Sequence, residues 1–88
     1  MLKPVYLRSF EGELDKAKKR GYDMKKIRDV MDDLIKEKPL AAKHRNHKLK
    51  GNFVGYWECH ITPDWLLIYK KDDEKIYFAR TGTHSDLF

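Results

Sequence analysis

The apolar residues in the first half of the chain repeat with the period of two amphipathic helices. Ser9 is a residue type that caps helices, so we expect a first helix from there to about residue 20, ended by Gly21. Asp23 predicts the start of a second helix, which must end before Pro39. The apolar positions are Phe10, Leu14 and Ala17 in the first helix and Met24, Ile27, Val30, Met31, Leu34 and Ile35 in the second. Together the two segments predict a helical hairpin.

Four other segments have the composition and two-residue alternation of strands. These are residues 2–7, 52–60, 65–69 and 75–80. Pro4 cannot donate a backbone hydrogen bond, which favours an edge position for the first strand. The links at residues 62–64 and 71–74 are short and favour antiparallel neighbours. The order β-α-α-β-β-β predicts an α+β fold, with the N-terminal helical hairpin packed on one face of a small, mainly antiparallel sheet.

Strand alternation assigns the polar residues of these segments to faces of the sheet. Glu58 and His60 share one face. Cys59 points to the other face, and we interpret it as a small buried hydrophobic residue, not a nucleophile. By the same period residues 76, 78 and 80 share a face, which places Arg80 where its strand ends. We therefore expect the first pair to face Arg80 and His84 across the sheet.

The length and composition fit one small domain. A chain of 88 residues has room for one modest core, so we expect a single domain over residues 1–88. The apolar runs are too short to cross a bilayer and the N-terminus lacks a signal-peptide pattern. We therefore expect a cytoplasmic protein with no membrane partner. The single cysteine, Cys59, excludes an internal disulfide and a cysteine-based zinc site within one chain.

Positive charge is concentrated between the helices and the last strands. Residues 36–50 hold six Lys or Arg residues against one acid, Glu37, so this basic segment alone carries +5, equal to the formal charge of the whole chain. Such a segment attracts polyanions such as RNA, although a solvated loop of a basic protein has the same composition. The candidate RNA-binding residues are Lys43, Arg45, Lys48 and Lys50. We interpret His44, which lies among them, as an exposed loop residue.

Residue types suited to acid–base chemistry occur in well-separated segments: His47, His60, Asp64, Arg80 and His84. RNA is cut when its 2′-oxygen attacks the adjacent phosphorus and the 5′-oxygen leaves, which requires removal of one proton, donation of another and stabilisation of phosphate charge. Histidines exchange protons near neutral pH, and positioned acid–base catalysis contributes roughly 10²–10⁴-fold. Arg80 could hold the phosphate through its planar fork, and Asp64 could accept a proton or orient a histidine. This set predicts phosphodiester cleavage without a metal or cofactor.

Other interpretations of the same residues remain open. Trp65 and Phe88 could stack on an RNA base or hold the catalytic residues in place, and either could instead belong to the core. The three histidines and Asp64 could also bind zinc. No HExxH-like spacing supports a metal site, however, and Arg80 would repel the cation.

Three segments carry a specific pattern of spacing. They read His47-x-Leu49-x-Gly51, Gly55-Tyr56-x-Glu58-x-His60-x-x-Pro63-Asp64-Trp65-x-Leu67-x-Tyr69 and Arg80-Thr81-Gly82-Thr83-His84-x-x-Leu87-Phe88. In these motifs, and in the order of hairpin, loop and strands, the sequence resembles the YafQ toxins of bacterial toxin–antitoxin systems, within the RelE/ParE superfamily. The resemblance implies a RelE/ParE-like fold and an mRNA endoribonuclease, or mRNA interferase, that cleaves ribosome-bound message and inhibits translation.

By position, the resemblance also implies the roles of individual residues. The catalytic positions fall on His47, His60, Asp64, Arg80 and His84, with Trp65 and Phe88 as substrate-positioning residues. Glu58 stands where YafQ has an aspartate. Its longer carboxylate keeps the charge and changes the reach, so we add it to the positioning residues. Cys59 stands where a small residue is usual, which affects packing only.

The implied partners are mRNA on the ribosome and a cognate antitoxin of the DinJ/RelB kind, whose acidic segment would cover the basic surface. Operator DNA would be bound only through the antitoxin. Two other function classes stay open: a non-catalytic ParE-type toxin that acts on DNA gyrase, and a basic RNA- or ribosome-binding module. A mutation series separates them, because only an enzyme loses cleavage while it keeps RNA binding.

Overall fold

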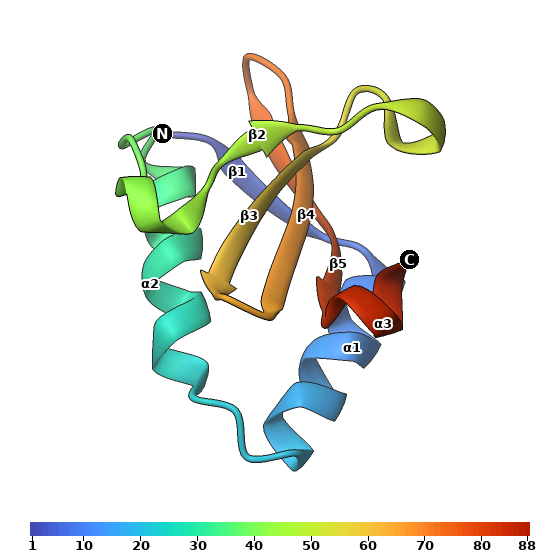
Figure 1. Ribbon diagram of the computed structural model, residues 1–88. Helices are drawn as coiled ribbons and strands as arrows, with labels where there is room; N and C mark the ends of the chain where they lie inside the picture. Colours follow the sequence, from blue (N-terminus) through green and yellow to red (C-terminus); the bar gives the residue numbers. More distant parts are fainter.

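A five-stranded sheet and two long helices make up most of the computed structural model, which describes residues 1–88 (Figure 1). The strands are β1 (Lys3–Tyr6), β2 (His47–Lys48), β3 (Trp57–Thr62), β4 (Trp65–Lys71) and β5 (Lys75–Gly82). The helices are α1 (Arg8–Lys19), α2 (Met24–Ile35) and the short α3 (His84–Leu87), with 3₁₀ turns η1 (Ala42–His44) and η2 (Gly51–Phe53). The strand order is β1-β5-β4-β3-β2, parallel between β1 and β5 and antiparallel elsewhere. The predicted α+β fold is confirmed.

Helices α1 and α2 supply the apolar layer on one face of the sheet. Their inner side chains, among them Phe10 and Ile27, join Phe78 and its strand neighbours in one hydrophobic core. The predicted cap of α2 is confirmed, because the Asp23 carboxylate accepts a hydrogen bond from the backbone N–H of Lys25 at 3.0 Å. None of the helices has the length and apolar character needed to span a bilayer.

The start of α1 differs from the prediction. Ser9 lies inside the first turn, and the preceding cap residue, Leu7, makes no side-chain hydrogen bond. The Ser9 hydroxyl instead donates to the carbonyl oxygen of Ala79 at 2.7 Å. A residue with the chemistry of a local cap therefore joins α1 to β5.

The strand predicted over residues 52–60 is wrong in its first half. β3 begins only at Trp57, because the chain before it forms η2 and a turn in which Gly51 and Gly55 have φ angles of +69° and +92°. These angles suit glycine and interrupt a strand. The two-residue strand β2 and the C-terminal helix α3 were not predicted.

An irregularity in β5 changes which residues share a face. Ile68 pairs with Arg80 while its neighbour Tyr69 pairs with Phe78, so Ala79 is an extra residue in the β5 strand. The prediction that residues 76, 78 and 80 share a face is wrong for this reason. Phe78 lies in the helix-side core, whereas Arg80 lies in one row with Ile68 and Glu58 on the opposite face. The expectation that Glu58 and Arg80 share a face is therefore confirmed.

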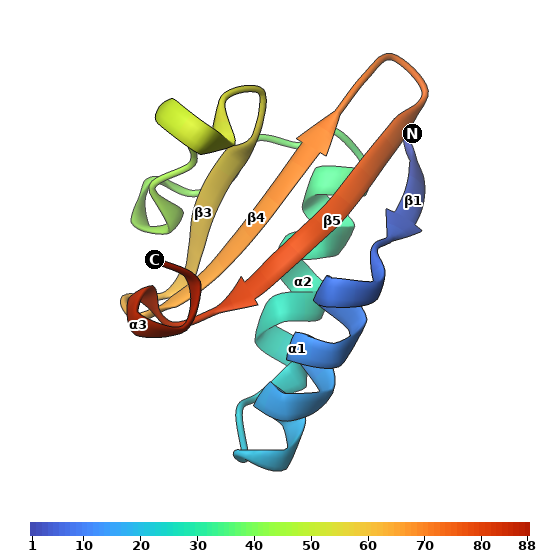
Figure 2. The same ribbon diagram turned by 90° about the vertical axis from the view of Figure 1, so that its right-hand side faces the viewer.

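We call the side of the sheet away from α1 and α2 the open face. Its centre is a small cluster of Leu66, Ile68, Ala79 and Leu87. Leu87 comes from α3, which follows the end of β5 and lies away from α2 (Figure 2). Phe53 and Tyr56 pack at the margin of the cluster.

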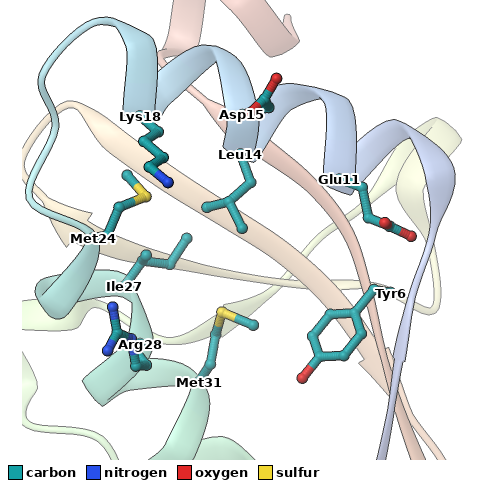
Figure 3. A pocket seen from close by; sticks show the side chains of 9 residues that line it. All are labelled: Tyr6, Glu11, Leu14, Asp15, Lys18, Met24, Ile27, Arg28 and Met31. Carbon is teal, nitrogen blue, oxygen red and sulfur yellow. The ribbon is translucent and has the colours of Figure 1, made fainter.

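A groove lies between α1 and α2, on the helical side of the molecule (Figure 3). Its lining residues are Tyr6, Glu11, Leu14, Asp15, Lys18, Met24, Ile27, Arg28 and Met31. It contains no histidine and is separate from the open face, where the predicted catalytic residues gather.

Candidate active site

The three predicted catalytic histidines form a row on the open face. His47 of β2 lies opposite Glu58 of β3, His60 follows further along β3, and His84 is the first residue of α3. The ring centroids of His47 and His60 are 6.4 Å apart, and those of His60 and His84 are 6.0 Å apart. The fold thus brings together side chains from three separate segments.

Backbone carbonyls orient two of these rings. Nδ1 of His47 donates to the carbonyl oxygen of Arg45 at 2.6 Å. Nδ1 of His60 donates to that of Pro63 at 3.2 Å. A carbonyl can only accept, so Nδ1 carries the hydrogen in both rings. Nε2 of each ring faces Oε1 of Glu58, at 3.5 Å for His47 and 3.7 Å for His60. Nε2 is therefore the nitrogen that can gain or lose a proton.

Glu58 is buried next to the rings of His47 and His60. Its side chain is 6% exposed. Its carboxylate lies near both His47 and His60 and can form an ion pair with either ring when that ring is protonated. Burial of a carboxylate is costly unless a cation or hydrogen bond compensates it. This position is compatible with the expected positioning role of Glu58, because its carboxylate lies next to His47 and His60.

His84 and Asp64 form an accessible pair beside this row. Nδ1 of His84 lies 3.6 Å from Oδ1 of Asp64, and the two side chains are 58% and 74% exposed. Asp64 sits in the tight turn between β3 and β4, which aims its carboxylate at the start of α3. Both groups can reach a polymer bound on the open face.

A network at the start of α3 fixes the position of His84. The Thr83 hydroxyl accepts from the backbone N–H of Asp86 at 3.2 Å, and the Asp86 carboxylate accepts from that of Thr83 at 3.1 Å. Arg20 of α1 donates to the same carboxylate at 3.1 Å. The backbone hydrogen bond from Thr83 is the main cause of a lowered pKa for Asp86. Gly82 leaves room for this network, since a Cβ there would lie 3.0 Å from the Asp86 Cβ and would press on that side chain.

Phe88 combines packing with exposure. Its ring meets Phe53 edge-on at 5.5 Å between centroids and lies 6.2 Å from the ring of His84. The residue is nevertheless 59% exposed. Much of the Phe88 side chain is therefore open to solvent next to His84.

Trp65 does not share this surface, and of the roles left open for it, its burial disfavours stacking on a base. It is 3% exposed and belongs to the helix-side core, where its ring meets Tyr22 edge-on at 4.9 Å. Its Nε1 donates to the Thr81 hydroxyl at 2.9 Å. This contact agrees with the other roles left open for Trp65, as a core residue and as a residue that holds the end of β5 next to Arg80 in place.

Arg80 already has a carboxylate partner that sequence reasoning missed. Its Nε donates to both oxygens of Glu13 at 2.8 and 3.0 Å, and its Nη2 donates to Oε2 at 2.7 Å. This pairing raises the pKa of Arg80 further. The predicted phosphate fork is corrected accordingly: the Nε edge is occupied by α1, and the remaining N–H groups are free to face a phosphate.

The basic segment does not form one surface. Lys48 pairs in register with Trp57 and places its Nζ 5.4 Å from that ring, on the opposite side of β2 from His47. Its position does not support the predicted contact with RNA at the histidine row. The exposed Lys43 and Arg45, at η1, and Lys50, at the start of η2, remain candidates.

His44 is a functional candidate that the sequence did not reveal. It was expected to be exposed, but it is half-buried, and its Nδ1 donates to the carbonyl oxygen of His60 at 2.6 Å. The β3–β4 register shifts just after His60, so this bond supports the backbone where the strand pairing is irregular. No signal in the local sequence indicates the contact, because it joins residues 16 positions apart.

Cysteine and metal chemistry can be assessed from the same geometry. Cys59 is fully buried on the helix side, and burial raises the pKa of its thiol to about 12. The interpretation of Cys59 as a buried hydrophobic residue is confirmed. The structure contains no group of three or more His, Cys, Asp or Glu side chains arranged to hold a metal ion.

Comparisons with known proteins give one consistent result. The model of a family described as a bacterial toxin of type II toxin–antitoxin system, YafQ, matches residues 2–88. The mRNA interferase toxin YafQ of Escherichia coli K12 is 42% identical over 84 residues, which cover 94% of this chain and 91% of that protein. The crystal structure of YafQ from E. coli BL21(DE3) has a TM-score of 0.95 and 38% identity, covering 100% of this chain and 99% of that one. The crystal structure of the E. coli DinJ–YafQ toxin–antitoxin complex contains a chain that matches with a TM-score of 0.92 and 40% sequence identity. This match covers 99% of the present chain and 97% of that one.

Proposed function

The chain belongs to the YafQ family of bacterial toxins from type II toxin–antitoxin systems, and we propose that its activity as an mRNA endoribonuclease proceeds by acid–base catalysis on the open face. The 2′-oxygen of the message attacks the adjacent phosphorus and the 5′-oxygen leaves. Cleavage takes place on ribosome-bound message and so stops translation. The reaction takes place in the cytoplasm, where translation provides the substrate.

The observation that carries this proposal is the row of three histidines with its two carboxylates. Centroid separations of 6.4 and 6.0 Å allow neighbouring rings to reach the 2′- and 5′-oxygens of one phosphodiester. One ring accepts the proton of the attacking hydroxyl and another donates a proton to the leaving oxygen. Such positioned proton transfer is worth roughly 10²–10⁴-fold in rate.

The remaining site residues act on charge and position. Arg80 faces the phosphate oxygens with the N–H groups that Glu13 leaves free, and it stays cationic throughout the reaction. Asp64 orients His84, and Glu58 orients His47 and His60. These side chains supply acid, base and cation, so we propose that the chemical step needs no metal ion.

The regulatory partner is a cognate antitoxin related to DinJ, which accompanies YafQ in the E. coli complex. We propose that an acidic part of the antitoxin covers the basic segment, residues 36–50, and closes the way to the histidine row. Operator DNA is bound through the antitoxin. A ParE-type toxin acting on gyrase would have no use for three aligned histidines, so we favour the nuclease.

The test is to map cleavage sites on translated mRNA, with and without ribosomes, for the wild type and for His84→Ala. We expect cuts by the wild type on ribosome-bound message, and loss of at least about 10²-fold of the rate in the variant with RNA binding retained. Ser85→Ala, on the same short helix, is the matched control and should cut normally. Full activity of His84→Ala would remove this histidine from the mechanism.

A second arm of this experiment tests the metal-free step. A short RNA and a high enzyme concentration avoid the magnesium requirement of ribosomes. Cleavage of this RNA should continue in EDTA, because side chains perform every proton transfer. Activity that EDTA abolishes and zinc restores would show that a metal takes part.

A further inference from the structure

The open face carries a second group of side chains, beyond the histidine row, that the proposed cleavage does not use. Lys70 of β4 pairs in register with Tyr77 of β5, on the side of the sheet that also holds Ile68. The Nζ of Lys70 lies 5.3 Å from the ring centroid of Tyr56 and 5.3 Å from that of Tyr77. We call Tyr56, Lys70 and Tyr77 the tyrosine–lysine row.

Two further lysines extend the positive charge of this row. Lys3 of β1 pairs with Lys75 of β5 in the same parallel register that pairs Val5 with Tyr77. Because strand residues alternate, both lysines point to the face that holds Tyr77, and both are exposed. Glu58 is the only acidic residue in the five strands, and it is buried. Accessible charge at the strand positions of this face is therefore positive.

Aromatic contacts connect the row to the candidate active site. The ring of Phe53 lies 5.5 Å from that of Phe88 and 6.4 Å from that of Tyr56. Tyr56 also precedes His60 by four residues and lies on the same side of the chain. In extended backbone, four residues place the two Cα atoms about 13 Å apart. A series of side-chain contacts thus links His84 and Phe88, through Phe53 and Tyr56, to the rest of the tyrosine–lysine row.

We propose that the tyrosine–lysine row binds the stretch of single-stranded message next to the cleaved phosphodiester. Bases stack on the rings of Tyr77 and Tyr56, while Lys70 and the two flanking lysines face the phosphates. This inference rests on the proposed nuclease function and adds a substrate subsite to it. It also places the RNA-binding cations on strands β1, β4 and β5, whereas the sequence had indicated residues 36–50.

The chemistry of the row favours RNA over a protein partner. Sequence-tolerant sites for single strands combine aromatic platforms with cations along the backbone, and stacking is sizeable for every base. Lys70 also contacts both rings through cation–π interactions in the free protein, which restricts the motion of all three side chains. Little side-chain freedom is then lost when a base arrives.

The experiment measures binding of fluorescent single-stranded RNAs, about 4 to 16 nucleotides long, to chains made inactive by His84→Ala. In this background, Tyr77→Ala should weaken binding of the longer RNAs about tenfold and leave the shortest almost unchanged. Lys70→Gln should lower the slope of log affinity against log salt by about 0.7. Tyr77→Phe should bind as the parent does, since it keeps the ring.

Matched controls come from neighbouring strand positions on the helix side. Tyr6→Ala removes an exposed tyrosine that pairs with Phe78, and Lys71→Gln removes the lysine next to Lys70. Both should bind RNA as the parent does. Thermal melting of each variant shows whether it is folded.

The outcomes separate this inference from the proposed function. If Tyr77→Ala and Lys70→Gln bind long RNA like the parent, or lose affinity for the antitoxin only, the row is not an RNA subsite. If the wild type fails to cut message while the length-dependent binding is observed, the subsite stands and the nuclease proposal fails.

Discussion

At the scale of single residues, the candidate site depends on partners that are distant in sequence. Glu13 lies 67 positions before Arg80, yet it holds one edge of the guanidinium in a fixed orientation. An oriented cation loses less rotamer freedom when it meets a phosphate than a free side chain would. The negative charge of Glu13 partly neutralises the positive charge of Arg80. The same pairing fixes the direction in which the remaining N–H groups of Arg80 point.

His44 is the residue-scale case that mutation can test most directly. Replacing His44 by alanine should lower the rate constant of cleavage by about tenfold with little change in KM, because displacement of a catalytic group by ~1 Å costs up to about 10²-fold. His44→Asn should recover most of the rate, since its amide N–H can replace Nδ1 as donor to His60. Steady-state kinetics on the same message would show both effects.

The matched control is Lys43→Ala in the same 3₁₀ turn. This change should weaken RNA association mildly, with a dependence on salt, and leave the rate constant unchanged. Equal activity of His44→Ala and the wild type would mean that the hydrogen bond to His60 only packs the loop.

At the scale of elements, α3 is too short to be stable by itself, since isolated helices need roughly 12–15 residues. Its position depends on the capping box of Thr83 and Asp86, on burial of Leu87, and on Arg20 from α1. These contacts set the direction in which His84 and Phe88 leave the sheet. The element that carries the candidate catalytic residue His84 is therefore held in place mainly by its neighbours.

Weakening the contacts that hold α3 in place should reduce the cleavage rate more than it reduces the stability of the fold. We expect Arg20→Gln to lower the cleavage rate several-fold with a small change in melting temperature, because it frees α3 and removes no core contact. Lys19→Gln, which affects only an exposed pair with Asp15, should behave as the wild type. A normal rate in Arg20→Gln would show that the capping box holds α3 without help.

The contacts that hold α3 should weaken at low pH, because they include the Asp86 carboxylate. The lowered pKa of Asp86 means that its contribution to α3 is complete above the ordinary carboxyl range and is lost as the pH falls through the lowered value. Amide signals of residues 83–88 would report this change.

At the scale of the whole molecule, the two faces of the sheet have separate tasks. α1 and α2 bury one face and stabilise the fold, while the open face keeps its histidines, tyrosines and lysines accessible. This division lets substrate-contacting residues vary at little cost to the core.

Production of the chain alone should arrest translation, and production of the cognate antitoxin should restore it. The reason is the proposed arrangement, in which the toxin carries the nuclease site and the antitoxin covers it. The His84→Ala chain is the control, because it should bind the antitoxin normally and leave growth unaffected. Growth curves and incorporation of labelled amino acids would measure the effect. Normal translation in cells that accumulate the folded wild-type chain would contradict the toxin assignment.

Local signals were enough to predict α1, α2 and the existence of β3, β4 and β5, although not the start of β3 or the helix α3. The Asp23 cap and the 3.6-residue period act within one segment, so they can be read directly. The position of Arg80 could not be derived correctly, because the extra residue Ala79 arises from pairing with β4. Tertiary contacts also determine the role of Ser9, which was misread as a cap, and the side of β2 on which Lys48 lies.

The parallel pairing of β1 with β5 has a consequence for the order of events during synthesis. Residues 3–6 leave the ribosome early but must wait for residues 75–78 before their hydrogen bonds can form. His84 and Phe88 follow later still. A nascent chain therefore cannot complete the sheet, or bring the three histidines together on its open face, until residues 75–84 have been synthesised.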